Sequence, residues 1–356
     1  MRIRELIEIA VDSRASDLHL RVGSVPTLRV YGNLVAIEGL SPLKPQDVEA
    51  YFEELATEEK RKAFALRHEL DFEYSFPNYV RCRINVLQQR STLSIAMRII
   101  PFKIPTIEEL GLPNILKELA LKRSGLILIT GATGSGKSST IAAMVDYLNE
   151  NEERNVITIE DPIEYVYKNK KCLIVQRNVG HDTESFDVAL VHALRHDPDV
   201  IVIGEIREII TMQTAIRAAE TGHLVLGTMH TVDAAQTIHR IIDMFPDKQQ
   251  EQIRSELAQI IVAVLCQFLI PRKEGTGRVP AFEIMLANNA IRNLIREGRI
   301  HQLYSQIQVS KREGMQTLNQ ALNSLLDRGL ITREEAYAKT SMLEELKSLH
   351  QTYGTS

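Results

Sequence analysis

The 356-residue sequence has no tryptophan, only three cysteines and no long apolar segment. A membrane-spanning helix needs about 20 consecutive apolar residues, so no transmembrane segment is expected. Cys82, Cys172 and Cys266 are far apart and form no Cys-x-x-Cys pair, which argues against a disulfide framework or a four-cysteine zinc site. The charged residues 1–5 lack the apolar stretch of a secretory signal. We therefore expect a cytoplasmic protein.

The sequence also has no strong excess of positive or of negative residues. Lysine and arginine number 42 against 46 aspartates and glutamates, for a formal net charge of −4. This balance, and the lack of a basic stripe interleaved with aromatic residues, argues against a dedicated nucleic-acid-binding protein. The chain shows no internal repeat, and its length is sufficient for two domains.

Short alternating segments separated by turn residues fill the first hundred positions. Strands are expected at residues 17–22, 27–31, 34–37, 71–76, 82–87 and 93–98, and helices at 3–13 and 45–66. This pattern is typical of a small α+β domain with an antiparallel sheet, over residues 1–100. Pro101 and Pro105 then mark an inter-domain linker over residues 101–112.

Residues 113–356 have a different pattern, in which continuous apolar runs alternate with helical segments. Strands are expected at residues 126–129, 156–159, 200–203 and 224–228, and helices at 139–148, 185–195 and 211–220. The order predicts a doubly wound α/β nucleotide-binding domain with a parallel sheet. After about residue 245 the pattern becomes mostly helical, with apolar residues at helical spacing over 253–268.

A P-loop motif follows the first of these strands, where residues 131–138 read Gly-Ala-Thr-Gly-Ser-Gly-Lys-Ser. Glycines let the backbone N–H groups face a triphosphate, and the next helix adds its positive end. Lys137 is expected to reach the β- and γ-phosphates of ATP, and the Ser138 hydroxyl to bind Mg²⁺. The expected nucleotide-binding residues are Gly131, Thr133, Gly134, Ser135, Gly136, Lys137, Ser138 and Ser139.

Acidic residues and a histidine follow the other three strands. Residues 160–164 read Glu-Asp-Pro-Ile-Glu, Glu205 follows the third strand and His230 the fourth. Ligands of open α/β sheets bind at these strand ends. ATP hydrolysis needs an acid beside the metal, expected to be Glu205, and a base for water, either Glu164 or Glu160. Strand-end acids also cap helices, which is the structural alternative.

Four segments together resemble the secretion ATPase superfamily of type II secretion and type IV pilus motors. They are the P-loop, an aspartate box at 157–164, a Walker B segment at 197–205 and a histidine box at 222–231. Gly204 stands where most P-loop ATPases have an aspartate, as is usual in this family. The resemblance implies a PAS-like N-terminal domain, a RecA-like ATPase domain with a helical C-terminal region, and a homo-hexamer.

The same resemblance assigns roles to individual residues. It makes Glu164 the catalytic base, Glu205 the Walker B acid that assists metal binding, and His230 a residue near the γ-phosphate. It also places Arg83 and Arg98 of the N-terminal domain against the nucleotide, where guanidinium groups neutralise developing charge. Alternatively, Arg83 and Arg98 are surface charges that keep exposed strands from pairing with other strands.

Two further segments resemble the pilus retraction branch of this family, residues 15–21 (Ala-Ser-Asp-Leu-His-Leu-Arg) and residues 290–298 (Ala-Ile-Arg-Asn-Leu-Ile-Arg-Glu-Gly). The extra N-terminal domain and zinc element usual in assembly motors are not found. The resemblance thus implies an ATPase that powers pilus retraction and twitching motility, acting on a platform protein at the inner membrane. The alternatives are a nucleic-acid translocase with a similar core and a P-loop kinase of a small molecule.

Overall fold

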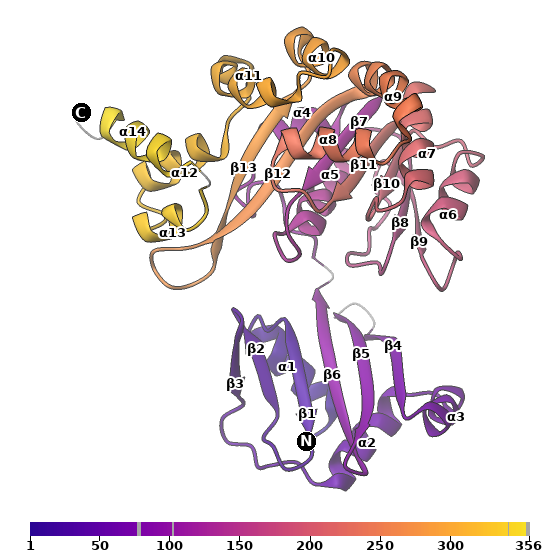
Figure 1. Ribbon diagram of the computed structural model, residues 1–356. Helices are drawn as coiled ribbons and strands as arrows, with labels where there is room; N and C mark the ends of the chain where they lie inside the picture. Colours follow the sequence, from indigo (N-terminus) through magenta and orange to yellow (C-terminus); the bar gives the residue numbers. More distant parts are fainter. Residues whose placement is uncertain (77–79, 102, 341, 354–356) are drawn as a thin grey trace. The chain divides into compact units, whose positions relative to one another are not determined.

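The computed structural model describes residues 1–76, 80–101, 103–340 and 342–353 (Figure 1). Contacts divide it into two compact units, Met1–Lys103 and Ile104–Ser356. None of the helices in the described ranges is long and apolar enough to cross a membrane.

The domain bounds 1–100, 101–112 and 113–356 stay predictions. Within the expected linker, residue 102 lies outside the described part of the chain. Ile107 and Leu112, which also fall in this stretch, are buried in a core cluster of the second unit.

The first unit is built on the expected antiparallel sheet, in the order β3-β2-β1-β6-β5-β4. Its strands are β1 (Asp17–Arg21), β2 (Thr27–Val30), β3 (Asn33–Ala36), β4 (Glu69–Phe76), β5 (Val80–Gln89) and β6 (Thr92–Pro101), and its first helix is α1 (Ile3–Asp12). The single helix expected over 45–66 is wrong. It is two helices, α2 (Pro45–Leu55) and α3 (Glu58–Arg67), because the Thr57 hydroxyl caps a new helix start by accepting a hydrogen bond from the Lys60 N–H.

The second unit contains a seven-stranded sheet in the order β13-β12-β7-β11-β10-β8-β9, parallel except for β13. Its strands are β7 (Gly125–Thr130), β8 (Asn155–Glu160), β9 (Leu173–Asn178), β10 (Val200–Ile203), β11 (Leu224–Met229), β12 (Ile261–Pro271) and β13 (Arg278–Leu286). The four predicted strands are confirmed as β7, β8, β10 and β11, whereas β9 was not expected.

Helices cover both faces of this sheet. One core cluster joins it to α4 (Ile115–Ala120) and α5 (Lys137–Asn151). Another joins it to α6 (Phe186–Ala193), α7 (Ile209–Glu220), α8 (Ala234–Asp243), α9 (Asp247–Ile260) and α10 (Asn289–Arg296). The doubly wound α/β arrangement predicted from the sequence is therefore confirmed (Figure 1).

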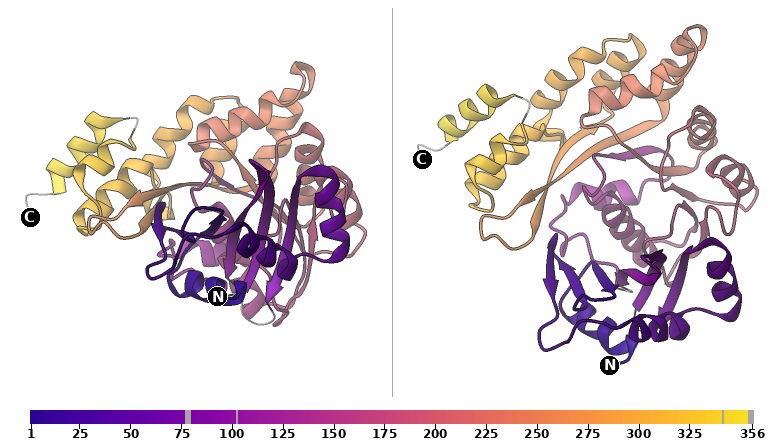
Figure 2. Two further views of the ribbon diagram at one scale, coloured as in Figure 1. Left: turned by 90° about the horizontal axis from the view of Figure 1, so that it is seen from below. Right: turned by 60° about the horizontal axis from the view of Figure 1, so that its bottom comes forward.

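The helix expected over residues 253–268 is confirmed up to Ile260 and wrong beyond it. Helix α9 ends at Ile260, and the following residues form β12, which pairs with β7. Apolar residues at almost every position fit a buried strand as well as a helix, and sheet pairing decides between them. The β12–β13 hairpin is long, and its far end packs against three C-terminal helices, α12 (Leu318–Asp327), α13 (Arg333–Tyr337) and α14 (Leu343–Tyr353) (Figure 2). Helix α11 (Leu303–Val309) instead packs in the cluster that contains α8 and α10.

Candidate nucleotide-binding site

The P-loop connects the end of β7 at Thr130 to the start of α5 at Lys137. Gly131, Gly134 and Gly136 have φ angles of 139°, 78° and 90°, a region that L side chains rarely adopt. A Cβ atom at Gly131 would lie 2.4 Å from the Gln267 carbonyl oxygen, so a larger residue does not fit. No side chain caps the start of α5, so its first N–H groups are available to an anion.

Lys137 lies across this loop. Its Nζ donates hydrogen bonds to the carbonyl oxygens of Gly131 (2.7 Å) and Ala132 (3.1 Å). Burial lowers the pKa of Lys137, and the nearby charges of Glu205 and Glu164 oppose that change. The P-loop ammonium group therefore lies within the electrostatic field of two of the predicted acids.

Two other predicted nucleotide-binding residues have distinct surroundings. Ser138 is half-buried at the first turn of α5. The Ser139 hydroxyl lies 2.8 Å from the hydroxyl of Tyr165, the residue after Glu164. This hydrogen bond joins the aspartate-box segment to the helix that follows the P-loop.

Glu160 and Glu164, the two candidate bases, differ in how tightly they are held. The Glu160 carboxylate accepts hydrogen bonds from Thr158 Oγ1 (2.6 Å) and Gln176 Nε2 (3.1 Å). Burial raises the pKa of Glu160. Glu164 is exposed, and none of the described residues donates a hydrogen bond to its carboxylate. Glu160 thus anchors the loop, while Glu164 is free to approach a water molecule.

Glu205 lies at the end of β10 between two basic side chains. His230 Nε2, at the end of β11, is 2.9 Å from Glu205 Oε1, and Arg207 Nη2 donates to Glu205 Oε2 at 2.7 Å. Burial alone would raise the pKa of Glu205, but Arg207, His230 and Lys137 outweigh it and lower this pKa. The carboxylate is therefore ionised near neutral pH, as a metal-side acid requires.

Packing explains the unusual glycine in the Walker B segment. A Cβ atom at Gly204 would lie 3.1 Å from the Ile159 carbonyl oxygen and 3.2 Å from Glu160 Cα. An aspartate here would crowd the backbone at the end of β8. The close approach of β8 and β10 keeps Glu160 and Glu205 on neighbouring strands.

Arg83 and Arg98 belong to the first unit, where they are directly paired across β5 and β6. Both are exposed, and Arg98 Nε lies 3.1 Å from Asp17 Oδ1. Among the described residues, none forms a hydrogen bond or ion pair with the Arg83 side chain. The two guanidinium groups share one face of the sheet, and their role towards a nucleotide stays a prediction.

The second unit therefore brings Lys137, Glu164, Glu205 and His230 to the carboxyl edge of one sheet. Sequence reasoning missed Gln176 and Tyr165, which hold the aspartate-box segment. Gln176 Nε2 donates to the Tyr165 carbonyl oxygen at 2.7 Å. A signal was available for Tyr165, which adjoins Glu164, but not for Gln176, since β9 itself was not predicted.

Helix α10 occupies the segment that resembles retraction motors. Arg292 is structural, because its Nη1 donates to the carbonyl oxygens of Ala258 (2.5 Å) and Gln259 (2.6 Å) at the end of α9. Arg296 and Glu297, by contrast, are exposed. The helix is thus anchored through Arg292, while the charged side chains at its C-terminal end are exposed to solvent.

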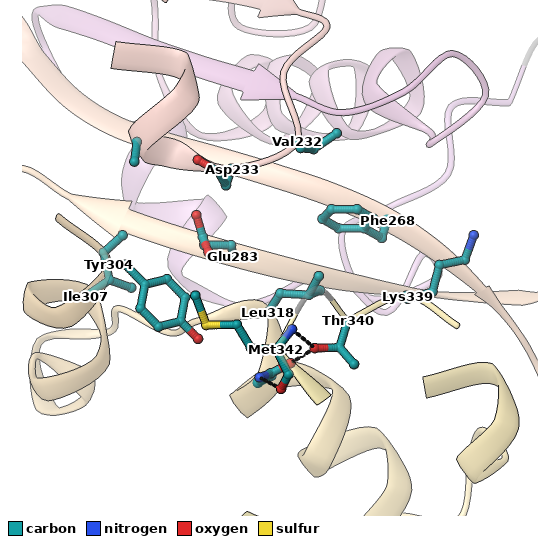
Figure 3. A pocket seen from close by; sticks show the side chains of 12 residues that line it. Val232, Asp233, Phe268, Glu283, Tyr304, Ile307, Leu318, Lys339, Thr340 and Met342 are labelled. Carbon is teal, nitrogen blue, oxygen red and sulfur yellow. Dashed lines mark hydrogen bonds between the residues drawn. The ribbon is translucent and has the colours of Figure 1, made fainter. Parts of the chain in front are cut away.

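A cavity of about 420 Å³ begins beyond the histidine box, at Val232 and Asp233 (Figure 3). Glu283 of β13 points into it, and its Oε1 accepts a hydrogen bond from the Ala234 N–H (2.8 Å) at the start of α8. Burial raises the pKa of Glu283 to about 7. This buried acid ties the histidine-box segment to the β12–β13 hairpin.

Comparison with known proteins identifies the family of the chain. The profile of the family described as "Type II/IV secretion system protein" matches residues 2–338. The chain is 46% identical over 344 residues to the type IV pilus retraction ATPase PilT of Pseudomonas aeruginosa, covering 97% of this chain and 99% of that protein. It is 40% identical to the type IV pilus ATPase PilU of the same organism, covering 98% and 91%.

A solved structure is similar over the same length. The crystal structure of the pilus retraction motor PilT with bound ADP matches with a TM-score of 0.89 and 45% identity, covering 98% of this chain and 99% of that one. A second, the Legionella pneumophila ATPase DotB, matches with a TM-score of 0.84 and 26% identity, covering 94% of each chain. The chain therefore belongs to the type II/IV secretion system protein family.

Proposed function

We propose that this chain is an ATPase that powers type IV pilus retraction and thereby twitching motility. The observation that carries the proposal is the full-length similarity to a pilus retraction ATPase, in a chain whose P-loop, Glu164, Glu205 and His230 meet at one sheet edge. The protein works as a homo-hexamer at the cytoplasmic face of the inner membrane, where it engages a pilus platform protein.

The residues of the second unit account for ATP hydrolysis. Loop N–H groups and Lys137 bind the β- and γ-phosphates, and Glu164 takes the proton of the attacking water. The Ser138 hydroxyl and the Glu205 carboxylate are oxygen donors of the kind that Mg²⁺ prefers. When bound, Mg²⁺ neutralises phosphate charge. His230, hydrogen-bonded to Glu205, is placed to respond to the γ-phosphate.

Force generation also involves the first unit. We assign it to a PAS-like domain over residues 1–100, joined through 101–112 to a RecA-like domain over 113–356. Arg83 and Arg98 supply guanidinium groups to the nucleotide, so that hydrolysis changes the arrangement of the two domains. The exposed side of α10, with Arg296 and Glu297, couples this cycle to retraction.

A deletion strain of the bacterium that carries this gene tests the function directly. We expect the strain to keep surface pili and lose retraction, and the wild-type gene to restore it. Lys137→Ala is not expected to restore it, whereas Lys248→Ala, at an exposed position on α9, serves as the matched control. Normal retraction in the deletion strain would refute the proposal.

A further inference from the structure

Gln267 is a buried polar residue in an otherwise apolar strand. It lies on β12 directly after Cys266, which pairs with Thr130, the last residue of β7. Its register therefore places it beside Gly131, where the P-loop begins. Gln267 is 2% exposed, although glutamine is mostly found at protein surfaces.

Gln267 contacts the phosphate loop and its helix at three points. Its Oε1 accepts a hydrogen bond from Thr140 Oγ1 (2.7 Å), in the first turns of α5. Its Nε2 would be 2.9 Å from a Cβ atom at Gly136, and its carbonyl oxygen 2.4 Å from one at Gly131. One residue thus lies against the first and the last glycine of the loop and bonds to the helix behind it.

We propose that Gln267 is a positioning residue for nucleotide binding, which holds the P-loop in the curvature that directs its N–H groups and Lys137 at the phosphates. The inference rests on the ATP binding that the proposed function includes. It differs from the roles already assigned, because Gln267 acts from a neighbouring strand through Thr140 and the two glycines.

The free-energy cost of an unpaired buried hydroxyl group favours this role over simple packing. Thr140 is fully buried, so its hydroxyl needs a partner, and Gln267 provides one. A leucine would fill a similar space beside Gly136 and Thr140, but it would leave the Thr140 hydroxyl without a partner. An unsatisfied buried group costs about 1–3 kcal/mol, and α5 can relieve that cost by shifting. Such a shift would displace Lys137, the first residue of α5.

The dissociation constant for a fluorescent ADP analogue tests the proposal in the full-length protein. We expect Gln267→Leu to weaken binding about tenfold, and Thr140→Val to do the same from the other side of the hydrogen bond. Thr140→Ser, which keeps the hydroxyl, should bind within about twofold of wild type. The double variant should also lose about tenfold, because both single changes remove the same interaction.

Thermal unfolding of each variant separates positioning from stability. A folded Gln267→Leu protein that binds as wild type does would overturn the proposal. So would a double variant that loses about a hundredfold, since the two residues would then act independently. If Gln267→Leu does not fold, Thr140→Val and Thr140→Ser report on the same hydrogen bond. Failure of the wild-type protein itself to bind would refute the proposed function instead.

Discussion

His230 Nε2 lies 2.9 Å from Glu205 Oε1, which joins the ends of β11 and β10. The contact connects the histidine box to the Walker B acid without any intervening residue. A displacement of the His230 ring would therefore act directly on the Glu205 carboxylate. Lys137 belongs to the same group, since its charge also lowers the pKa of Glu205.

Replacing His230 should affect turnover more than binding. We expect His230→Ala to lower kcat by about tenfold or more, because Glu205 loses a partner that orients it. ADP affinity should change little, since the P-loop is intact. Steady-state ATPase assays and nucleotide titration measure both quantities, and equal losses in the two would contradict a role for His230 in the hydrolysis step.

Substitution of each candidate base should show which of the two acts in hydrolysis. Glu164→Gln is expected to keep nucleotide binding and thermal stability while lowering kcat by about 10²-fold or more, the usual contribution of a general base. Glu160→Gln should mainly disturb the hydrogen bonds with Thr158 and Gln176 and retain more activity. The reverse order of kcat values would make Glu160 the base.

Removal of the P-loop lysine should abolish ligand stabilisation. Wild-type protein at 100 times its dissociation constant for ADP gains about 2.7 kcal/mol, so its Tm rises with nucleotide. Lys137→Ala should show no such rise, with its Tm in the absence of nucleotide close to that of wild type. A preserved ADP-dependent rise would remove Lys137 from the site.

Glu283 gives the protein a pH-dependent stability. Its pKa rises from 4.5 to about 7 on folding, so between these values the folded protein binds more protons than the unfolded chain. Stability should therefore fall as pH rises through this window, by up to about 3 kcal/mol at about 1.36 kcal/mol per pKa unit.

Glu283→Gln provides the comparison for that effect. The variant cannot ionise, so its unfolding free energy, measured with urea from pH 5 to pH 8, should fall less than that of wild type. The ten histidines are common to both proteins, so their contributions cancel in the difference. Parallel curves for the two proteins would show that Glu283 does not titrate in this range.

Substitutions at the exposed charges of α10 should impair pilus retraction without impairing ATP hydrolysis. Combined Arg296→Ala and Glu297→Ala changes lie on its exposed side, so ATPase activity is expected to stay within about twofold of wild type while pilus retraction in cells is lost. Arg292→Ala is the contrasting variant, since it removes hydrogen bonds to α9 and should lower the Tm. A parallel loss of ATPase activity in the exposed double variant would make the whole helix structural.

The sequence predicts the central strands because both of their faces are buried. Val200 to Ile203, for example, are all fully buried or nearly so, which produces a continuous apolar run. Strand β9 lies at the sheet edge with Leu173 and Val175 exposed, and the second half of the strand is polar, Gln-Arg-Asn over residues 176–178. At Ile261 the apolar pattern fits either element, and pairing with β7 selects a strand.

Site residues that belong to a sequence motif could be predicted, whereas residues outside any motif that hold the P-loop in place could not. Lys137, Glu164, Glu205 and His230 each follow a recognisable strand end. Gln267 supports the same loop from β12, yet a single glutamine in an apolar run has no motif. Its function depends on which strand lies beside β7, and only the fold contains that information.

The anchoring of α10 at the end of α9 has a mechanical consequence. Arg292 donates hydrogen bonds to the carbonyl groups of Ala258 and Gln259. From there the backbone continues into β12, whose residue Gln267 lies against the phosphate loop. A force applied to α10 would therefore reach the phosphate loop along backbone that is paired with β7.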